Sequence, residues 1–200
     1  MGMKSPLIIS IALHVGVLLL FSSNIGSIFS SKIKDTVMTV SGDRSYQAAM
    51  RLHKEMPDVK VRFVNVVDLM RLEPKDRHPH GLSDVDYDTI FTKDKPIIFA
   101  FHGYPTLIHE LTYTRHNHNI HVHGYHEEGT ITTPFDMRVQ NKIDRFNLVI
   151  AMINHLPSLG NRGAFLVQKM KDKLVEHKTY IHDVGIDMPE VAEWQWTGLK

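Results

Sequence analysis

The chain has 200 residues and a mass of 23.0 kDa, enough for one domain or one domain plus an appendage, but not for a multidomain enzyme. Its composition is globular, with 42% hydrophobic and 22% charged residues. The 23 Lys and Arg against 22 Asp and Glu give a formal net charge of +1, which argues against a nucleic-acid binder that relies on bulk charge. The absence of cysteine excludes disulfides, thiolate metal sites and a cysteine nucleophile.

The charges divide the chain into two parts. No Asp, Glu, Lys or Arg occurs in residues 5–31, whereas the residues that follow mix basic and acidic side chains in nearly equal number. We therefore predict two units, an apolar N-terminal segment at 1–31 and a well-solvated globular domain at 32–200.

The N-terminal segment is apolar enough to suggest a membrane helix. Residues 7–21 would form a helix roughly 22 Å long, and the whole stretch 5–29 reaches the roughly 30 Å of a hydrocarbon core. We predict an apolar helix that serves as a membrane anchor or an uncleaved signal. The alternative is a buried hairpin or a core helix. Ser10 and His14 within this segment resemble the Ser-x-x-x-His anchor of the Ton/Tol-type energy transducers of the bacterial envelope.

Past residue 32, short apolar runs alternate with segments of helical periodicity. The run at 96–101 is continuously apolar, as in strands covered on both faces, and Ser83 is a suitable N-cap for a short acidic helix. Strands separated by helices predict an α/β fold with a mainly parallel sheet. The predicted strands lie at 36–41, 59–67, 96–101 and 120–125, and the predicted helices at 45–56, 84–91, 105–113, 134–139, 145–156 and 164–177.

Histidines concentrate in the middle of the chain, where residues 102–126 hold half of the 14. Residues two apart in a strand share a face, so His121, His123 and Tyr125 should project together while Val122 faces the other way. Two imidazoles at this spacing, completed by a further His or Glu, could bind zinc in a His-based metal site. The alternative is a polar loop whose imidazoles donate hydrogen bonds or lie at an interface.

The segment after this predicted strand combines turn-forming and hydrogen-bonding residues. From Gly124 to Thr133 it holds two glycines, two carboxylates and three threonines, which can present N–H and hydroxyl groups to an anion or a neighbouring subunit. Thr133, followed by Pro and then by Asp136, is predicted to cap a helix. Glu127 and Glu128 are adjacent and should point apart, which argues against a general acid–base pair. Neither a nucleotide-binding glycine motif nor a Gly-x-Ser-x-Gly motif occurs.

Several longer motifs run through the globular part. They are KVRFVNVVDLM at 60–70, LSD at 82–84, FTKDKP at 91–96, FAFHGY at 99–104, NH at 117–118, HVHGY at 121–125, EEGT at 127–130, TTPFDM at 132–137 and IDRF at 143–146. Together they resemble the C-terminal domain of the xylulose-5-phosphate/fructose-6-phosphate phosphoketolases, in register from about residue 34 to residue 196.

This resemblance implies a fold and an activity for the complete enzyme. The implied fold is a transketolase-type C-terminal domain, a three-layer α/β/α arrangement with a mostly parallel five-stranded sheet. The complete enzyme uses thiamine diphosphate and Mg to convert a ketose phosphate and inorganic phosphate into acetyl phosphate, an aldose phosphate and water. Its two preceding domains hold the cofactor across a dimer interface, and the C-terminal domain supports and joins them.

For this chain the resemblance implies a structural and dimer-forming role. The sequence has no Gly-Asp-Gly followed by Asn, the magnesium–diphosphate motif, so we expect no cofactor in this chain and no activity from it alone. The implied partners are the two thiamine-binding domains or a like subunit in a homodimer, and the implied location is the cytoplasm. The rival is a membrane-tethered interaction module, held through residues 5–29, that reuses the fold without catalysis.

No catalytic residue and no metal ligand is assigned. The predicted functional surface is the segment from His121 to Thr133, at the carboxyl side of the sheet or at a subunit interface. Its members are His121, His123, Gly124, Tyr125, Glu127, Glu128, Gly129, Thr130, Thr132 and Thr133.

Overall fold

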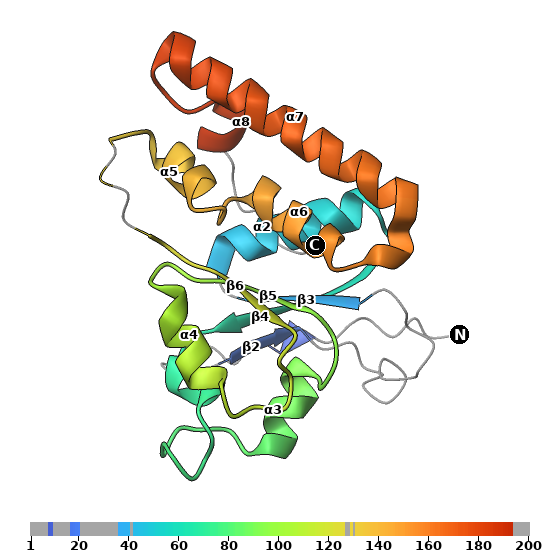
Figure 1. Ribbon diagram of the computed structural model, residues 1–200, viewed down its shortest axis with the longest axis vertical. Coiled ribbons are helices and arrows are strands. Elements are labelled where there is room, and N and C mark those ends of the chain that lie inside the picture. Colours follow the sequence, from blue (N-terminus) through green and yellow to red (C-terminus); the bar gives the residue numbers. More distant parts are fainter. Residues whose placement is uncertain are drawn as a thin grey trace.

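The computed structural model describes residues 8–9, 17–20, 36–40, 42–126, 129 and 131–193, with helices on both faces of a six-stranded sheet (Figure 1). The four strands β3 to β6 are parallel, while β1 and β2 are antiparallel additions at one edge. The predicted three-layer α/β/α fold with a mostly parallel sheet is confirmed, but the sheet has six strands rather than five. In spatial order the strands are β1 (Ile8–Ile9), β2 (Val17–Leu20), β4 (Lys60–Val66), β3 (Thr36–Val40), β5 (Ile97–Ala100) and β6 (Ile120–His123).

The helices divide between the two faces (Figure 1). One face carries α2 (Gly42–Glu55), α5 (Pro134–Gln140), α6 (Arg145–Asn154), η2 (Pro157–Leu159), α7 (Gly160–Val184) and α8 (Pro189–Ala192), and the other carries η1 (Leu69–Leu72), α3 (Asp84–Phe91) and α4 (Pro105–Thr112). Each helix predicted from periodicity is present. The last of them is longer than predicted at both ends, and it stops only at Gly185, whose φ of 79° makes a left-handed C-cap.

Strand β5 separates the two halves of the core. All four of its residues are buried. Ile98 and Ala100 pack with α2, α6 and α7, whereas Ile97 and Phe99 pack with α3 and α4. Because successive side chains of a strand point to opposite faces, this one apolar run serves both layers. The prediction of a strand covered on both faces is confirmed.

The described residues of the N-terminal segment lie in strands, so the predicted apolar helix is wrong there. β2 pairs antiparallel with β1, and Val17 and Leu19 of β2 lie opposite Val66 and Val64 of β4. The open edge of β4 offers unpaired backbone groups, which an uncharged apolar strand can satisfy. A short apolar run does not distinguish a strand from a buried helix by periodicity, and this antiparallel pair is the hairpin alternative.

The Ser-x-x-x-His pair of that segment lies outside the described residues. Where the structure describes the chain, no helix combines the length and the apolar character needed to cross a bilayer. The described strands therefore give the membrane-anchor prediction no support.

A buried arginine fixes the long connection between β4 and α3. Arg115 follows α4, and its side chain is only 1% exposed. It donates to the carboxylate of Asp84 at 2.7 Å and to backbone carbonyls of the connection, those of Leu72, Glu73 and Leu82. Since the guanidinium presents several donors in one plane, a single side chain satisfies carbonyls that have no partner in a helix or a sheet.

Candidate interface at the carboxyl end of the sheet

Strand β6 forms one edge of the sheet, and the predicted functional surface begins on this strand. Val122 packs with the apolar cluster under α3 and α4. His121 turns to the other face, where its ring stacks on His155, the residue that ends α6, with 3.5 Å between the ring centroids and 17° between the planes. His123 lies near both of these rings. The prediction that His121 and His123 share a face opposite to Val122 is confirmed.

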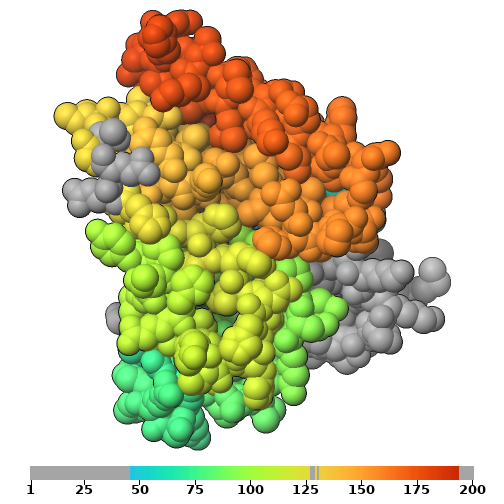
Figure 2. Space-filling model, viewed as in Figure 1, coloured from blue at the N-terminus to red at the C-terminus, as the bar shows by residue number. Residues whose placement is uncertain are grey.

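The edge strand is open to solvent on this side of the molecule. Figure 2 shows the yellow surface of β6 and its neighbours between the green surface of α4 and the orange surface of α6 and α7. A partner that approaches this side meets the edge of the sheet and the two helical layers together.

The three imidazoles of this face resist protonation. Burial lowers the pKa of His121, His123 and His155 below 6.5, and the nearby His155 lowers the pKa of His121 further. For His123, the charges of His121, His155 and Lys142 add to burial and lower its pKa. Neutral rings can both donate and accept hydrogen bonds, and His121 Nε2 lies 2.8 Å from Asn119 Oδ1.

The turn after β6 passes directly against the start of α4. A Cβ on Gly124 would lie 2.6 Å from the carbonyl oxygen of Gly103 and 2.6 Å from the ring of Pro105, so only glycine fits this approach. The backbone N–H of Tyr125 then donates to the same Gly103 oxygen at 2.9 Å. The sequence predicted a turn at Gly124 but not its neighbours, because these residues lie on a different connection.

The next two residues attach the segment to both helical layers. The hydroxyl of Tyr125 donates to the sulfur of Met137 in α5 at 3.6 Å. The backbone N–H of His126 donates to Asn141 Oδ1 at 2.6 Å. The imidazole ring of His126 packs edge to face against the ring of Tyr104. The segment is therefore held between α4 and the turn that follows α5.

The end of the surface is a helix cap. The hydroxyl of Thr133 accepts from the backbone N–H of Asp136 at 3.3 Å, which confirms the predicted cap of α5. The Asp136 carboxylate accepts from Thr132 at 2.6 Å and from Gln140 at 2.9 Å, with Lys178 at 3.4 Å. Burial opposes its charge, but these hydrogen bonds and the Lys178 charge outweigh burial and lower the pKa of Asp136.

Several members of the predicted surface keep only their sequence-based interpretation. Gly129 has a φ of 67°, the left-handed region that favours glycine. Glu127, Glu128 and Thr130 lie outside the described residues, so their roles stay predictions. In the part of the chain that the structure describes, no three His, Asp or Glu side chains gather as the ligands of a metal ion would.

Residues that the sequence did not reveal complete this surface. His155, Asn141 and Lys142 come from the ends of α5 and α6, and no local pattern marks them as neighbours of β6. Lys142 has a φ of 55°, an unusual backbone conformation for a residue with a side chain. An unusual turn of this kind is visible only in the structure.

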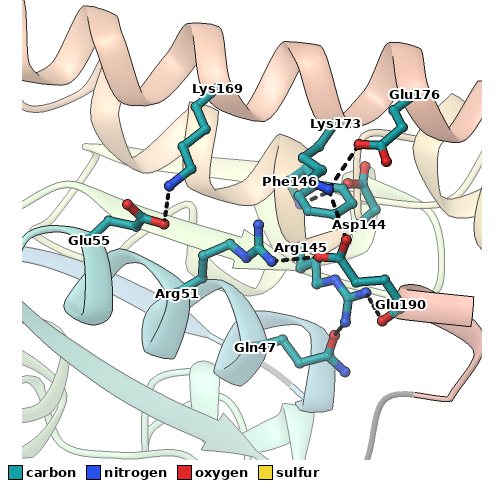
Figure 3. Close-up of polar contacts among 10 residues, drawn as sticks. All are labelled: Gln47, Arg51, Glu55, Asp144, Arg145, Phe146, Lys169, Lys173, Glu176 and Glu190. Carbon is teal, nitrogen blue, oxygen red and sulfur yellow. Dashed lines mark hydrogen bonds and ion pairs between the residues drawn. The ribbon is translucent and has the colours of Figure 1, made fainter.

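A second polar cluster joins the helices of the same layer (Figure 3). The carboxylate of Glu190 in α8 accepts from Arg51 of α2 and from Lys173 of α7, each at 3.0 Å. The carbonyl oxygen of the same residue accepts from Arg145 of α6 at 3.0 Å. Arg145 is 4% exposed and also donates to Gln47 at 3.0 Å. One residue of the short helix α8 thus links three helices and fixes the C-terminal part of the described chain.

The comparisons with known proteins decide the family. The family described as the XFP C-terminal domain matches residues 24–196. The chain belongs to this family. Its curated relatives include a probable phosphoketolase of Clostridium acetobutylicum, 62% identical over 166 residues, and one of Rhodopirellula baltica, 56% identical over 173 residues. The xylulose-5-phosphate phosphoketolase of Lactiplantibacillus pentosus is 54% identical over 153 residues.

These matches cover most of this chain and a small part of each relative. They include 81%, 84% and 76% of this chain, but only 21%, 22% and 19% of the respective relatives. The chain therefore spans about a fifth of their length and corresponds to a phosphoketolase C-terminal domain. The family match begins at residue 24, before the predicted boundary at 32. The Ton/Tol-type resemblance finds no support in these comparisons.

Among solved structures, a split-gene transketolase described as an inactive beta4 tetramer shares the arrangement in part. It has 16% sequence identity and a TM-score of 0.46, over 76% of this chain and 46% of that one.

Proposed function

We propose that this domain supports and joins the thiamine-binding domains of a phosphoketolase, the enzyme that converts a ketose phosphate and phosphate into acetyl phosphate, an aldose phosphate and water. The observation that carries the proposal is the family membership, together with 62% identity to a probable phosphoketolase over 166 residues. The surface from His121 to Thr133 is the part that contacts those domains or a second copy of the chain. The domain positions its partners and contributes no reacting group.

Thiamine diphosphate and Mg would belong to the partner domains. Among the described residues, the two most buried carboxylates, those of Asp136 and Asp144, are already occupied by hydrogen bonds at the starts of α5 and α6, which makes them poor ligands for Mg²⁺. Asp144 accepts from the backbone N–H groups of Phe146 and Asn147 at 2.8 and 3.1 Å, and Asp136 is held by the hydrogen bonds described above. When bound in the complete enzyme, the cofactor supplies the carbanion chemistry for carbon–carbon cleavage.

Purified on its own, the 200-residue chain should make no acetyl phosphate from xylulose 5-phosphate or fructose 6-phosphate with phosphate, thiamine diphosphate and Mg²⁺. It should instead form a complex with the Clostridium acetobutylicum relative from which the matching fifth has been removed. Acetyl phosphate is measured as its hydroxamate, and the complex by analytical ultracentrifugation. Catalysis by the isolated chain would contradict the proposal, and so would the absence of a complex at micromolar concentrations of two folded partners.

A further inference from the structure

The stack of His121 on His155 is a contact between two elements of different kinds. His121 belongs to the edge strand β6, and His155 ends α6. Ile120 and Val122 hold the opposite face of β6 through apolar packing. Within the described sheet, β6 pairs with β5 alone. The two imidazoles are therefore the principal side-chain contact recorded between β6 and the end of α6.

The electrostatic contacts that act on His121 and on its neighbour His123 all disfavour protonation. On β6 itself, the neighbouring titratable group is His123, and the turn before α6 adds Lys142. Neither ring of the stack forms an ion pair with a carboxylate among the described residues. His121 Nε2 meets only the neutral oxygen of Asn119. A proton added here gains no counter-charge from any described neighbour.

We propose that the His121–His155 stack is a proton-sensitive clasp, which holds β6 and the segment after it against α6 at neutral pH and opens on acidification. Neutral rings stack with a favourable contact. Protonation of both would place two positive charges about as far apart as the rings, in a half-buried site where water screens their repulsion only in part. Opening loosens β6 itself first, because the backbone hydrogen bonds of Tyr125 and His126 still tie the turn after it to Gly103 and Asn141.

The pKa values of the two rings in the closed state decide whether acid opens or closes the clasp. Burial, and for His121 the neighbouring His155, lower the pKa of both stacked rings below 6.5 when the clasp is closed. The open state therefore binds more protons, so the closed state is favoured above pH 6.5 and loses population as the pH falls below it. The clasp is a property of this chain, independent of any partner domain and of the proposed phosphoketolase role.

Hydrogen exchange of backbone amides, corrected for the intrinsic pH dependence, tests the clasp on the complete chain. Between pH 7.5 and 5, the amides of β6 should lose protection by up to about tenfold per pH unit for each proton taken up. The amides of α2, whose hydrogen bonds lie within the helix and not to β6, should keep theirs. The change His155→Phe retains an aromatic ring without a titratable group, and it should make β6 protection less dependent on pH over this range, because His121 then no longer faces a second imidazole. His182→Gln, at an exposed site on α7, should behave as the unaltered chain.

A second readout separates the clasp from general acid denaturation. The burial of His177 in α7 also lowers its pKa, which weakens the whole fold in acid, so the amides of α2 serve as the internal reference for global unfolding. Ring NMR should show His121 titrating below 6.5, and at a higher pH in H155F. If H155F does not fold, H121F provides the same test. Loss of β6 and α2 protection together, with no effect of either variant, would overturn the clasp.

Discussion

Replacing Arg115 with Met should lower the free energy of unfolding by about 3–5 kcal/mol, because three backbone carbonyls lose their donor and each buried unsatisfied group costs about 1–3 kcal/mol. Methionine has a similar length and keeps much of the apolar packing, but it cannot donate. The buried carbonyl of Leu72 would then lose its donor, and the partly buried carbonyl of Leu82 would lose one as well. The guanidinium also lies 4.3 Å above the ring of Tyr87, and this contact would be lost. Urea denaturation followed by circular dichroism measures the effect.

Two controls show whether the geometry of the donors or their charge is responsible. Arg115→Lys keeps the charge without the planar fork, so its stability should lie between those of the native chain and R115M. Arg162→Met removes another Arg–Asp pair, with Asp58, in which both side chains are largely exposed. That change should have a much smaller effect, since exposed pairs contribute little. Equal destabilisation by R115M and R162M would contradict the assigned role of Arg115.

Replacing Gly124 with Ala should destabilise the chain by about 3 kcal/mol and displace the start of the candidate interface. The new methyl group would meet a backbone oxygen and a proline ring, neither of which can move aside as a flexible side chain does. The turn after β6 must then shift away from α4 and break the hydrogen bond from Tyr125 to Gly103. Urea denaturation gives the free energy, and amide chemical shifts of residues 103–105 and 123–126 report the displacement.

The matched control lies on the same segment. Gly129, unlike Gly124, has a left-handed backbone, and no atom lies within 4 Å of the position that its Cβ would occupy. Gly129→Ala therefore carries only the conformational strain of about 1–2 kcal/mol and should leave the shifts near α4 unchanged. If G129A were as disruptive as G124A around residues 103–105, the close approach at Gly124 would not be what fixes this turn.

Local chemistry predicted the parts of the fold that depend on neighbours in sequence. Ser83 and Thr133 were predicted as N-caps, and both accept from the backbone N–H three residues later. The continuous apolar run at 96–101 predicted a strand buried on both faces, and its alternating side chains fill the two halves of the core. The shared face of His121 and His123 follows from strand periodicity alone.

Contacts between distant segments could not be predicted in this way. The antiparallel pairing of β2 with β4 leaves no mark on the sequence beyond an uncharged apolar run, which a membrane helix would explain equally well. Arg115 bonds mainly to backbone carbonyls, and every residue type has one. His155 and Glu190 act on elements far away along the chain, so nothing in their own neighbourhoods distinguishes them from other polar surface residues.

The most direct test of the proposed function is a graft. Residues 34–196 of this chain would replace the matching part of the Clostridium acetobutylicum phosphoketolase, and acetyl phosphate would be measured with xylulose 5-phosphate, phosphate, thiamine diphosphate and Mg²⁺. We expect the grafted enzyme to be active and the same relative without its C-terminal part to be inactive. A grafted protein that folds and dimerises yet forms no acetyl phosphate would contradict the account, as would full activity in the truncated relative.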